Sequence, residues 1–189
     1  RLMLTSLRFV QSFRVVGALV LAAVWLVLMS GSASAQCETG VTWTPHESNR
    51  QWTRVASSAD ATKLVAVVYG GQIYTSTDSG ATWTARASNQ QWWSVASSAN
   101  GSKLVAVAYN GQIYTSTDSG VSWIARASNQ SWTSVASSAD GTKLVAVVQN
   151  GRIYTSANSG VTWTARASNQ DWTSVASSAD GSKLVAAAQ

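Results

Sequence analysis

The chain has 189 residues, a formal net charge of +5 and an unusual aromatic content, with 10 Trp against 2 Phe. Three of its basic residues lie in the first 35 positions, and the remainder carries ten Lys and Arg against eight Asp and Glu. Such a small, scattered positive charge argues against nucleic acid or a charged membrane surface as the partner. The single Cys37 cannot form an internal disulfide, so the fold must be held by its core.

Residues 1–35 predict a secretory signal peptide. Arg8 and Arg14 precede an apolar run of 15 residues, 15–29, and Ala33-Ser34-Ala35 matches the small-x-small cleavage pattern. We expect cleavage after Ala35, which makes the protein secreted or periplasmic, with no stable membrane insertion afterwards. The alternative is an uncleaved anchor, although a spanning helix usually needs ~20 apolar residues.

The rest of the chain, 36–189, is built from a 40-residue repeat. Tryptophans recur at this spacing, and segments 92–131 and 132–171 are identical at 29 of 40 positions. Self-similarity at a fixed period is the sequence signature of a repeat architecture. We therefore expect complete units at 52–91, 92–131 and 132–171, with partial units at 36–51 and 172–189.

The sequence of each unit predicts four strands joined by tight turns, and no segment of the unit has the pattern of a helix. In the unit 132–171, strands are expected at 132–138, 143–149, 152–156 and 161–167. Asp140-Gly141 and Asn150-Gly151 are hairpin signals between them. The continuous apolar run 144–148 predicts a strand that is buried on both faces. Four antiparallel strands in 40 residues match one blade of an all-β β-propeller; a β-solenoid is the alternative.

The turn between the third and fourth strands carries a Ser-x-Asx-x-Gly-x-x-Trp motif. An Asx side chain can close such a turn by accepting backbone N–H groups, and glycine enters its strained conformation cheaply. Asn158 replaces Asp in the third copy, a change that a turn-closing residue tolerates and a catalytic carboxylate or calcium ligand generally does not. We predict structural roles for Ser76, Asp78, Gly80, Trp83, Ser116, Asp118, Gly120, Trp123, Ser156, Asn158, Gly160 and Trp163.

This motif resembles the Asp-box of the BNR-repeat, sialidase-like β-propellers. Among these families, the whole unit is most similar to the photosystem II assembly factors and related secreted bacterial proteins. The resemblance implies a propeller with Asp-boxes lying away from any active site. Similar boxes occur in sialidases, xyloglucan-cleaving glycosidases and sortilin-type receptors, so the motif specifies the fold far better than the function.

Few side chains that could take part in catalysis remain when the residues that repeat in every unit are excluded. The arginine motif of sialidases is absent, and Glu47 and Asp171 are the only loose candidates for the two facing carboxylates of other glycosidases. The lone His46 cannot make a metal site. The sequence therefore predicts no catalytic residue, metal or cofactor.

The sequence fits a ligand-binding role better than a catalytic one. The links between blades and the hairpins between second and third strands emerge on the same face of a propeller, where aromatic and amide side chains could contact a ligand. The candidates are Tyr69, Gln91, Trp93, Tyr109, Asn110, Gln149, Asn150 and Asp171. The competing interpretation is that Tyr69 and Tyr109 are ordinary strand-end packing.

The functional prediction is a non-catalytic secreted module that binds a protein or glycan partner, or serves as an assembly or scaffold factor. The alternative is a fragment of a sialidase-like or other glycoside hydrolase whose catalytic residues lie outside this chain. If the chain is complete, several copies are expected to assemble a closed ring.

Overall fold

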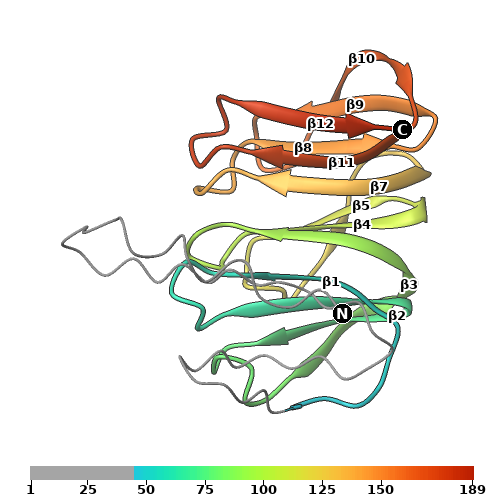
Figure 1. Cartoon of the computed structure of the whole chain (residues 1–189). Coiled ribbons are helices and arrows are strands. Elements are labelled where there is room, and N and C mark those ends of the chain that lie inside the picture. The colour runs from blue at the N-terminus through green and yellow to red at the C-terminus, as the bar shows by residue number, and fades with distance from the viewer. Residues whose placement is uncertain (1–44) are drawn as a thin grey trace, which may run out of the picture.

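A computed structural model describes residues 45–189, which form twelve β-strands and no helix (Figure 1). Accordingly, this part of the chain contains no helix of the length and apolarity needed to cross a membrane. The predicted signal peptide, its cleavage site and Cys37 lie outside the described residues. The strands are β1 (Trp52–Ser57), β2 (Leu64–Ser76), β3 (Thr84–Ser97), β4 (Leu104–Gly111), β5 (Ile113–Ser116), β6 (Ile124–Ala125), β7 (Gln130–Ser137), β8 (Leu144–Val148), β9 (Gly151–Ser156), β10 (Thr164–Gln170), β11 (Trp172–Ser177) and β12 (Leu184–Ala188).

Consecutive strands pair antiparallel from β1 to β6, from β7 to β10 and between β11 and β12, and the end of β4 also pairs antiparallel with the start of β7. The strands β7 to β10 form one four-stranded unit, and the second half of β3 forms another with β4, β5 and β6. In the first unit, the long strand β2 covers the positions of both β4 and β5. The last two strands, β11 and β12, form a separate two-stranded sheet.

The units stack in chain order, with β1 and β2 toward one end and β11 and β12 at the other (Figure 1). Backbone hydrogen bonds join the first hairpins of successive units. The N–H groups of Ala59, Ala99 and Ala139 each donate to the carbonyl of the residue 40 positions later, at 2.7 Å. Because the bond repeats at one position per unit, it fixes the stacking register.

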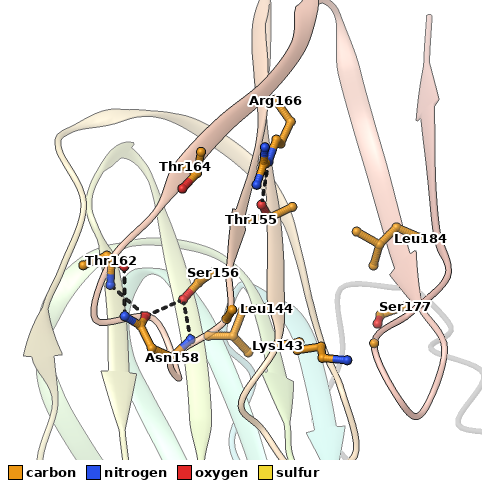
Figure 2. Close-up of a pocket in the computed structure, with 12 residues that line it drawn as sticks. Lys143, Leu144, Thr155, Ser156, Asn158, Thr162, Thr164, Arg166, Ser177 and Leu184 are labelled. Atoms are coloured by element: carbon orange, nitrogen blue, oxygen red, sulfur yellow. Dashed lines mark hydrogen bonds between the residues drawn. The ribbon is translucent and has the colours of Figure 1, made fainter.

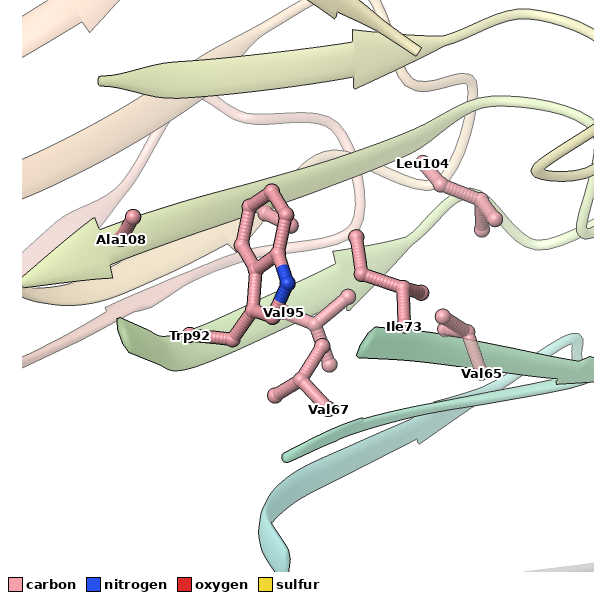
Figure 3. Close-up of a cluster of buried hydrophobic side chains, with 8 residues drawn as sticks. Val65, Val67, Ile73, Trp92, Val95, Leu104 and Ala108 are labelled. Carbon is pink, nitrogen blue, oxygen red and sulfur yellow. The ribbon is translucent and has the colours of Figure 1, made fainter. Parts of the chain in front are cut away.

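Apolar side chains fill the space between units. Figure 3 shows Val65, Val67 and Ile73 of the first unit packed against Trp92 and Leu104 of the second. The equivalent cluster between the second and third units contains Trp132, which like Trp92 is fully buried. Burying such large rings between units explains why a chain without disulfides uses so much tryptophan.

The second strand of the third unit is buried as its apolar run predicts. All five residues of β8 are less than a tenth exposed, because β7 and β9 flank the strand and neighbouring units cover both faces. The all-β architecture of antiparallel strands is thus confirmed for residues 45–189.

The fourth strand of the third unit begins at Thr164, three residues later than expected. The N–H of Val161 donates to the carbonyl of Asn158, and that of Thr162 donates to the Asn158 side-chain oxygen at 2.9 Å. The Trp163 indole N–H donates to the Gly160 carbonyl at 3.0 Å. These bonds hold residues 158–163 in the turn, so Trp163 covers the turn instead of opening the strand.

Candidate ligand-binding edge

Four side chains from three units form a continuous line at one edge of the stack, which we call the aromatic row: Tyr69, Trp93, Tyr109 and Gln149. The ring centroids of Tyr69 and Trp93 are 6.0 Å apart, and those of Trp93 and Tyr109 are 5.5 Å apart. The Tyr109 hydroxyl donates to Gln149 Oε1 at 2.9 Å. All four side chains are half-buried, so each packs against its neighbour and still meets solvent.

Strand position explains how the row arises. Tyr69, Tyr109 and Gln149 occupy equivalent places in successive units: Tyr69 lies within the long strand β2, Tyr109 lies near the end of β4, and Gln149 directly follows β8. Ladder pairing sets Tyr69 opposite Gln91, which belongs to the link into the next unit. The hairpin of one unit therefore lies beside the link to the following one.

Trp93 breaks the repeat. At the equivalent position, the hydroxyls of Thr53 and Thr133 donate to the backbone carbonyls of Trp92 and Trp172 in the following unit, at 3.0 and 2.7 Å. Among the described residues, the Trp93 indole makes no bond of this kind. Its ring fills the space between two tyrosines instead.

A cavity of about 360 Å³ opens beside the row. Gln91 and Asn110 at its wall are exposed, and the Asn110 side-chain oxygen accepts a hydrogen bond from the Ser131 hydroxyl at 2.8 Å. Asn110 also has a positive φ of 55°, which places it at the tip of its hairpin. The lining residues are Gly70, Asn89, Gln90, Gln91, Tyr109 and Asn110.

The structure brings six of the eight predicted ligand-face residues to this row and cavity. Asn150 is exposed in the turn that follows Gln149. Asp171 lies in the link before β11, where its carbonyl accepts the Gln189 N–H at 3.1 Å, and its Oδ1 atom is buried without a hydrogen-bond partner among the described residues. Sequence reasoning missed Asn89 and Gln90, because both recur in every unit and were set aside as repeat residues.

The three Ser-x-Asx-x-Gly turns share one hydrogen-bond pattern. In the first, Ser76 Oγ accepts the Gly80 N–H at 2.9 Å and donates to Asp78 Oδ1 at 2.7 Å, and Asp78 Oδ1 accepts the Thr82 N–H at 2.9 Å. Figure 2 shows the third turn, where Asn158 keeps the acceptor role and its amide donates to the Thr162 hydroxyl at 2.9 Å.

Five carboxylates of the described chain are engaged in turns. Hydrogen bonds from the Thr82 side chain and backbone lower the pKa of Asp78 to about 2. Bonds from Ser122 lower the pKa of Asp118 to about 2, and bonds from Ser58 and Thr62 do the same for Asp60. Serine and threonine hydroxyls likewise lower the pKa of Asp140 and of Asp180. Acids with such depressed pKa values are ionised at neutral pH and cannot donate a proton as general acids.

The remaining two described carboxylates belong to Glu47 and Asp171. Glu47 Oε2 lies 3.8 Å from Arg50 Nε. The described residues contain no group of three or more His, Cys, Asp or Glu side chains that could hold a metal ion. The chemistry at the edge is therefore that of neutral aromatic and amide groups.

The sequence matches no family model and no curated protein. Solved structures do match. An ancestral GH74 enzyme aligns with a TM-score of 0.61 and 21% identity, over 76% of this chain and 23% of the enzyme. YCF48 from Cyanidioschyzon merolae aligns with a TM-score of 0.57 and 18% identity, over 74% of this chain and 51% of YCF48. A structure of YCF48 bound to D1 peptide aligns with a TM-score of 0.52 and 21% identity, over 61% of this chain and 40% of that one.

These neighbours are β-propeller proteins, so the comparisons show a propeller-type fold. At such identities the likeness extends to the fold alone. The chain spans less than a quarter of the GH74 enzyme and about half of the YCF48 protein or less.

Proposed function

We propose that this chain is a non-catalytic, exported β-propeller module that binds an extended segment of a partner protein along the aromatic row. The observation that carries the proposal is Trp93. Residues that only hold the units together recur in every unit, whereas Trp93 replaces a threonine and gives up that residue's hydrogen bond between units. The Trp93 side chain lies half-exposed between Tyr69 and Tyr109.

The aromatic row is suited to contact an uncharged part of a ligand. Aromatic faces offer a large contact area, while the exposed amides of Gln91 and Asn110 can pair with backbone N–H and carbonyl groups of an extended chain. The solved structure of YCF48 bound to D1 peptide supports the proposal, because it is a peptide complex of a protein with this fold. Since the row has no charged side chain, binding should change little with salt.

A glycoside hydrolase fragment is the second candidate, favoured by the fold likeness to a GH74 enzyme. It requires two carboxylates that face each other across a substrate. Five of the seven described carboxylates close turns, which leaves Glu47 and Asp171 as the only ones for that role.

The test is selection of a phage-displayed random dodecapeptide library on the full chain, in parallel with a printed glycan array. The matched control is Trp93→Thr, which restores the residue found in the other units and leaves a folded stack. We expect enrichment of peptides on the wild-type chain that is lost on Trp93→Thr. Equal enrichment on both proteins would contradict the aromatic row as the site, and capture of glycans alone would favour the second candidate.

Export is tested separately by the intact mass of the secreted product. Cleavage after Ala35 leaves a chain that begins at Gln36, so the mass should fall by that of residues 1–35. A product of full mass retained in the membrane fraction would show that the apolar segment is an anchor.

A further inference from the structure

The backbone beside the aromatic row is already paired, so a ligand there finds no free strand edge among the described residues. Ladder pairing sets Tyr109 opposite Ser131, and the Ser131 carbonyl also accepts the Gln149 N–H at 2.9 Å. Tyr69 is held in the same way, since its N–H donates to the Gln51 carbonyl at 2.9 Å and it pairs with the link into the next unit. A peptide that binds by adding a β-strand needs unpaired backbone groups at an edge. The row must therefore recognise its ligand through side chains.

Two hydrogen-bond donors of the row are available to a ligand. Among the described residues, neither the Trp93 indole N–H nor the Tyr69 hydroxyl has a hydrogen-bond partner, and both atoms meet solvent. The Tyr109 hydroxyl, by contrast, donates to Gln149. An indole N–H can donate but cannot accept. A ligand that matches the row must therefore present a hydrogen-bond acceptor to Trp93.

The surroundings of these donors argue against two other modes of peptide recognition. None of the described residues that line the adjoining cavity is charged, so none of them can pair with a phosphate or carboxylate group. The lining consists of amide side chains, Gly70 and Tyr109, which do not form the apolar groove that an amphipathic helix needs. The mode that remains is an extended chain with unpaired carbonyl groups and rigid apolar side chains.

A polyproline II helix has this chemistry. It has no internal hydrogen bonds, so its carbonyl groups can accept bonds from side chains, and its conformation is fixed before binding. Three residues per turn and a rise of ~3.1 Å per residue give it a repeat of about 9 Å along one face. The rings of Tyr69 and Tyr109 lie 6.0 and 5.5 Å from the ring of Trp93 and flank it. The length of the row is therefore comparable to one turn of this helix.

We infer that the segment bound by the aromatic row is proline-rich and adopts a polyproline II helix, with prolines three residues apart. One proline ring packs toward Tyr69 and the other toward Tyr109, and the Trp93 indole N–H donates to a carbonyl group between them. The inference rests on the proposed function, because it specifies the ligand of the same row. A second copy of these 189 residues does not supply the segment, since they contain a single proline.

The test is fluorescence anisotropy of fluorescein-labelled decaproline titrated with the full chain. The control probe is decaproline made from D-proline, which has the same composition and the same apolar surface but forms a helix of the opposite hand. We expect saturable binding of the L-peptide, roughly tenfold or more tighter than that of the D-peptide, because only the left-handed helix matches the row.

Two chain variants separate the two contributions of Trp93. Trp93→Phe keeps an aromatic ring and loses the N–H donor, so binding should weaken about fivefold, which corresponds to one neutral hydrogen bond. Trp93→Thr also removes the ring, and binding should weaken by roughly tenfold or more. Circular dichroism reports whether each variant folds. The comparison of L- and D-decaproline on the unmodified chain decides the matter if they do not.

The inference is overturned if L-decaproline does not bind saturably, if the D-peptide binds equally well, or if folded Trp93→Thr binds as tightly as the unmodified chain. Full binding by Trp93→Phe would overturn the hydrogen bond from the indole.

Failure of this inference is distinguishable from failure of the proposed function. If dodecapeptides without proline are enriched on the unmodified chain and not on Trp93→Thr, while decaproline does not bind, the row binds peptides but not polyproline II helices. If neither kind of peptide binds, both proposals are wrong.

Discussion

At the scale of single residues, the turn carboxylates tie stability to pH. Asp60, Asp78 and Asp118 have pKa values of about 2 in the folded chain, held down by hydroxyl and backbone hydrogen bonds, against roughly 3.9 in an unfolded chain. A depressed folded pKa stabilises the fold above the unfolded value, and that contribution disappears as pH falls from about 4 to 2. We expect the midpoint of urea unfolding to drop over this window.

Replacing Asp78 and Asp118 by Asn should make this pH dependence shallower while leaving the fold intact. Asn158 shows that an amide keeps the acceptor bond to the N–H four residues later. The corresponding alanine variants lose that acceptor and should unfold at lower urea concentrations at pH 7. Unchanged pH profiles in the Asn double variant would show that other groups govern acid unfolding.

Glycine 160 combines backbone strain with close packing. Its φ is +82°, and a side chain there would meet Thr115 Cγ2 at 2.6 Å. Gly160→Ala should therefore destabilise the chain by about 1–3 kcal/mol. Gly70→Ala is the matched control, because Gly70 has a φ of +69° and open space around it, so only the strain of roughly 1 kcal/mol applies. If urea unfolding shows that the two variants lose the same free energy of unfolding, the contact with Thr115 does not contribute to the cost of Gly160→Ala.

At the scale of elements, tryptophans at one repeat position differ in how much neighbouring strands cover them. Trp132 on β7 is fully buried, with its ring 5.1 Å from that of Tyr154 on β9. Trp172 on β11 is half-buried, and among the described strands only β12 pairs with β11. Trp132→Ala should cost about 3–5 kcal/mol of unfolding free energy, and Trp172→Ala clearly less. Chemical denaturation of both variants checks the order, and a reversed order would mean that the last two strands anchor the stack.

At the scale of the whole molecule, the stack should tolerate loss of one complete unit. Deleting 92–131 brings the first unit against the third, and the Ala59 N–H then faces the carbonyl of Ala139 in place of that of Ala99. Because repeat stability is nearly a sum over units and their interfaces, the shortened chain should fold with lower stability and a smaller m-value. Deleting 102–121 removes half a unit and should abolish folding by circular dichroism. If both deletions unfold the chain, the units are not interchangeable.

The strand pattern was largely predictable because it depends on local signals. Hairpin residues such as Asn150 adopt positive φ, and the apolar run of β8 is buried as its composition indicates. The start of the fourth strand was wrong for an equally local reason. Val161 and Trp163 alternate like strand residues, but hydrogen bonds to Asn158 and Gly160 hold them in the turn.

The sequence by itself determined the period of 40 residues, the order of four antiparallel strands and the chemistry of the turns, since each rests on residues close together in the chain. Only the tertiary structure decided which residues from different units meet. It set Trp93 between Tyr69 and Tyr109, and Thr155 opposite Leu184, because those distances depend on how the units stack. Stacking register is fixed by backbone bonds and packing across unit interfaces, which local spacing does not encode.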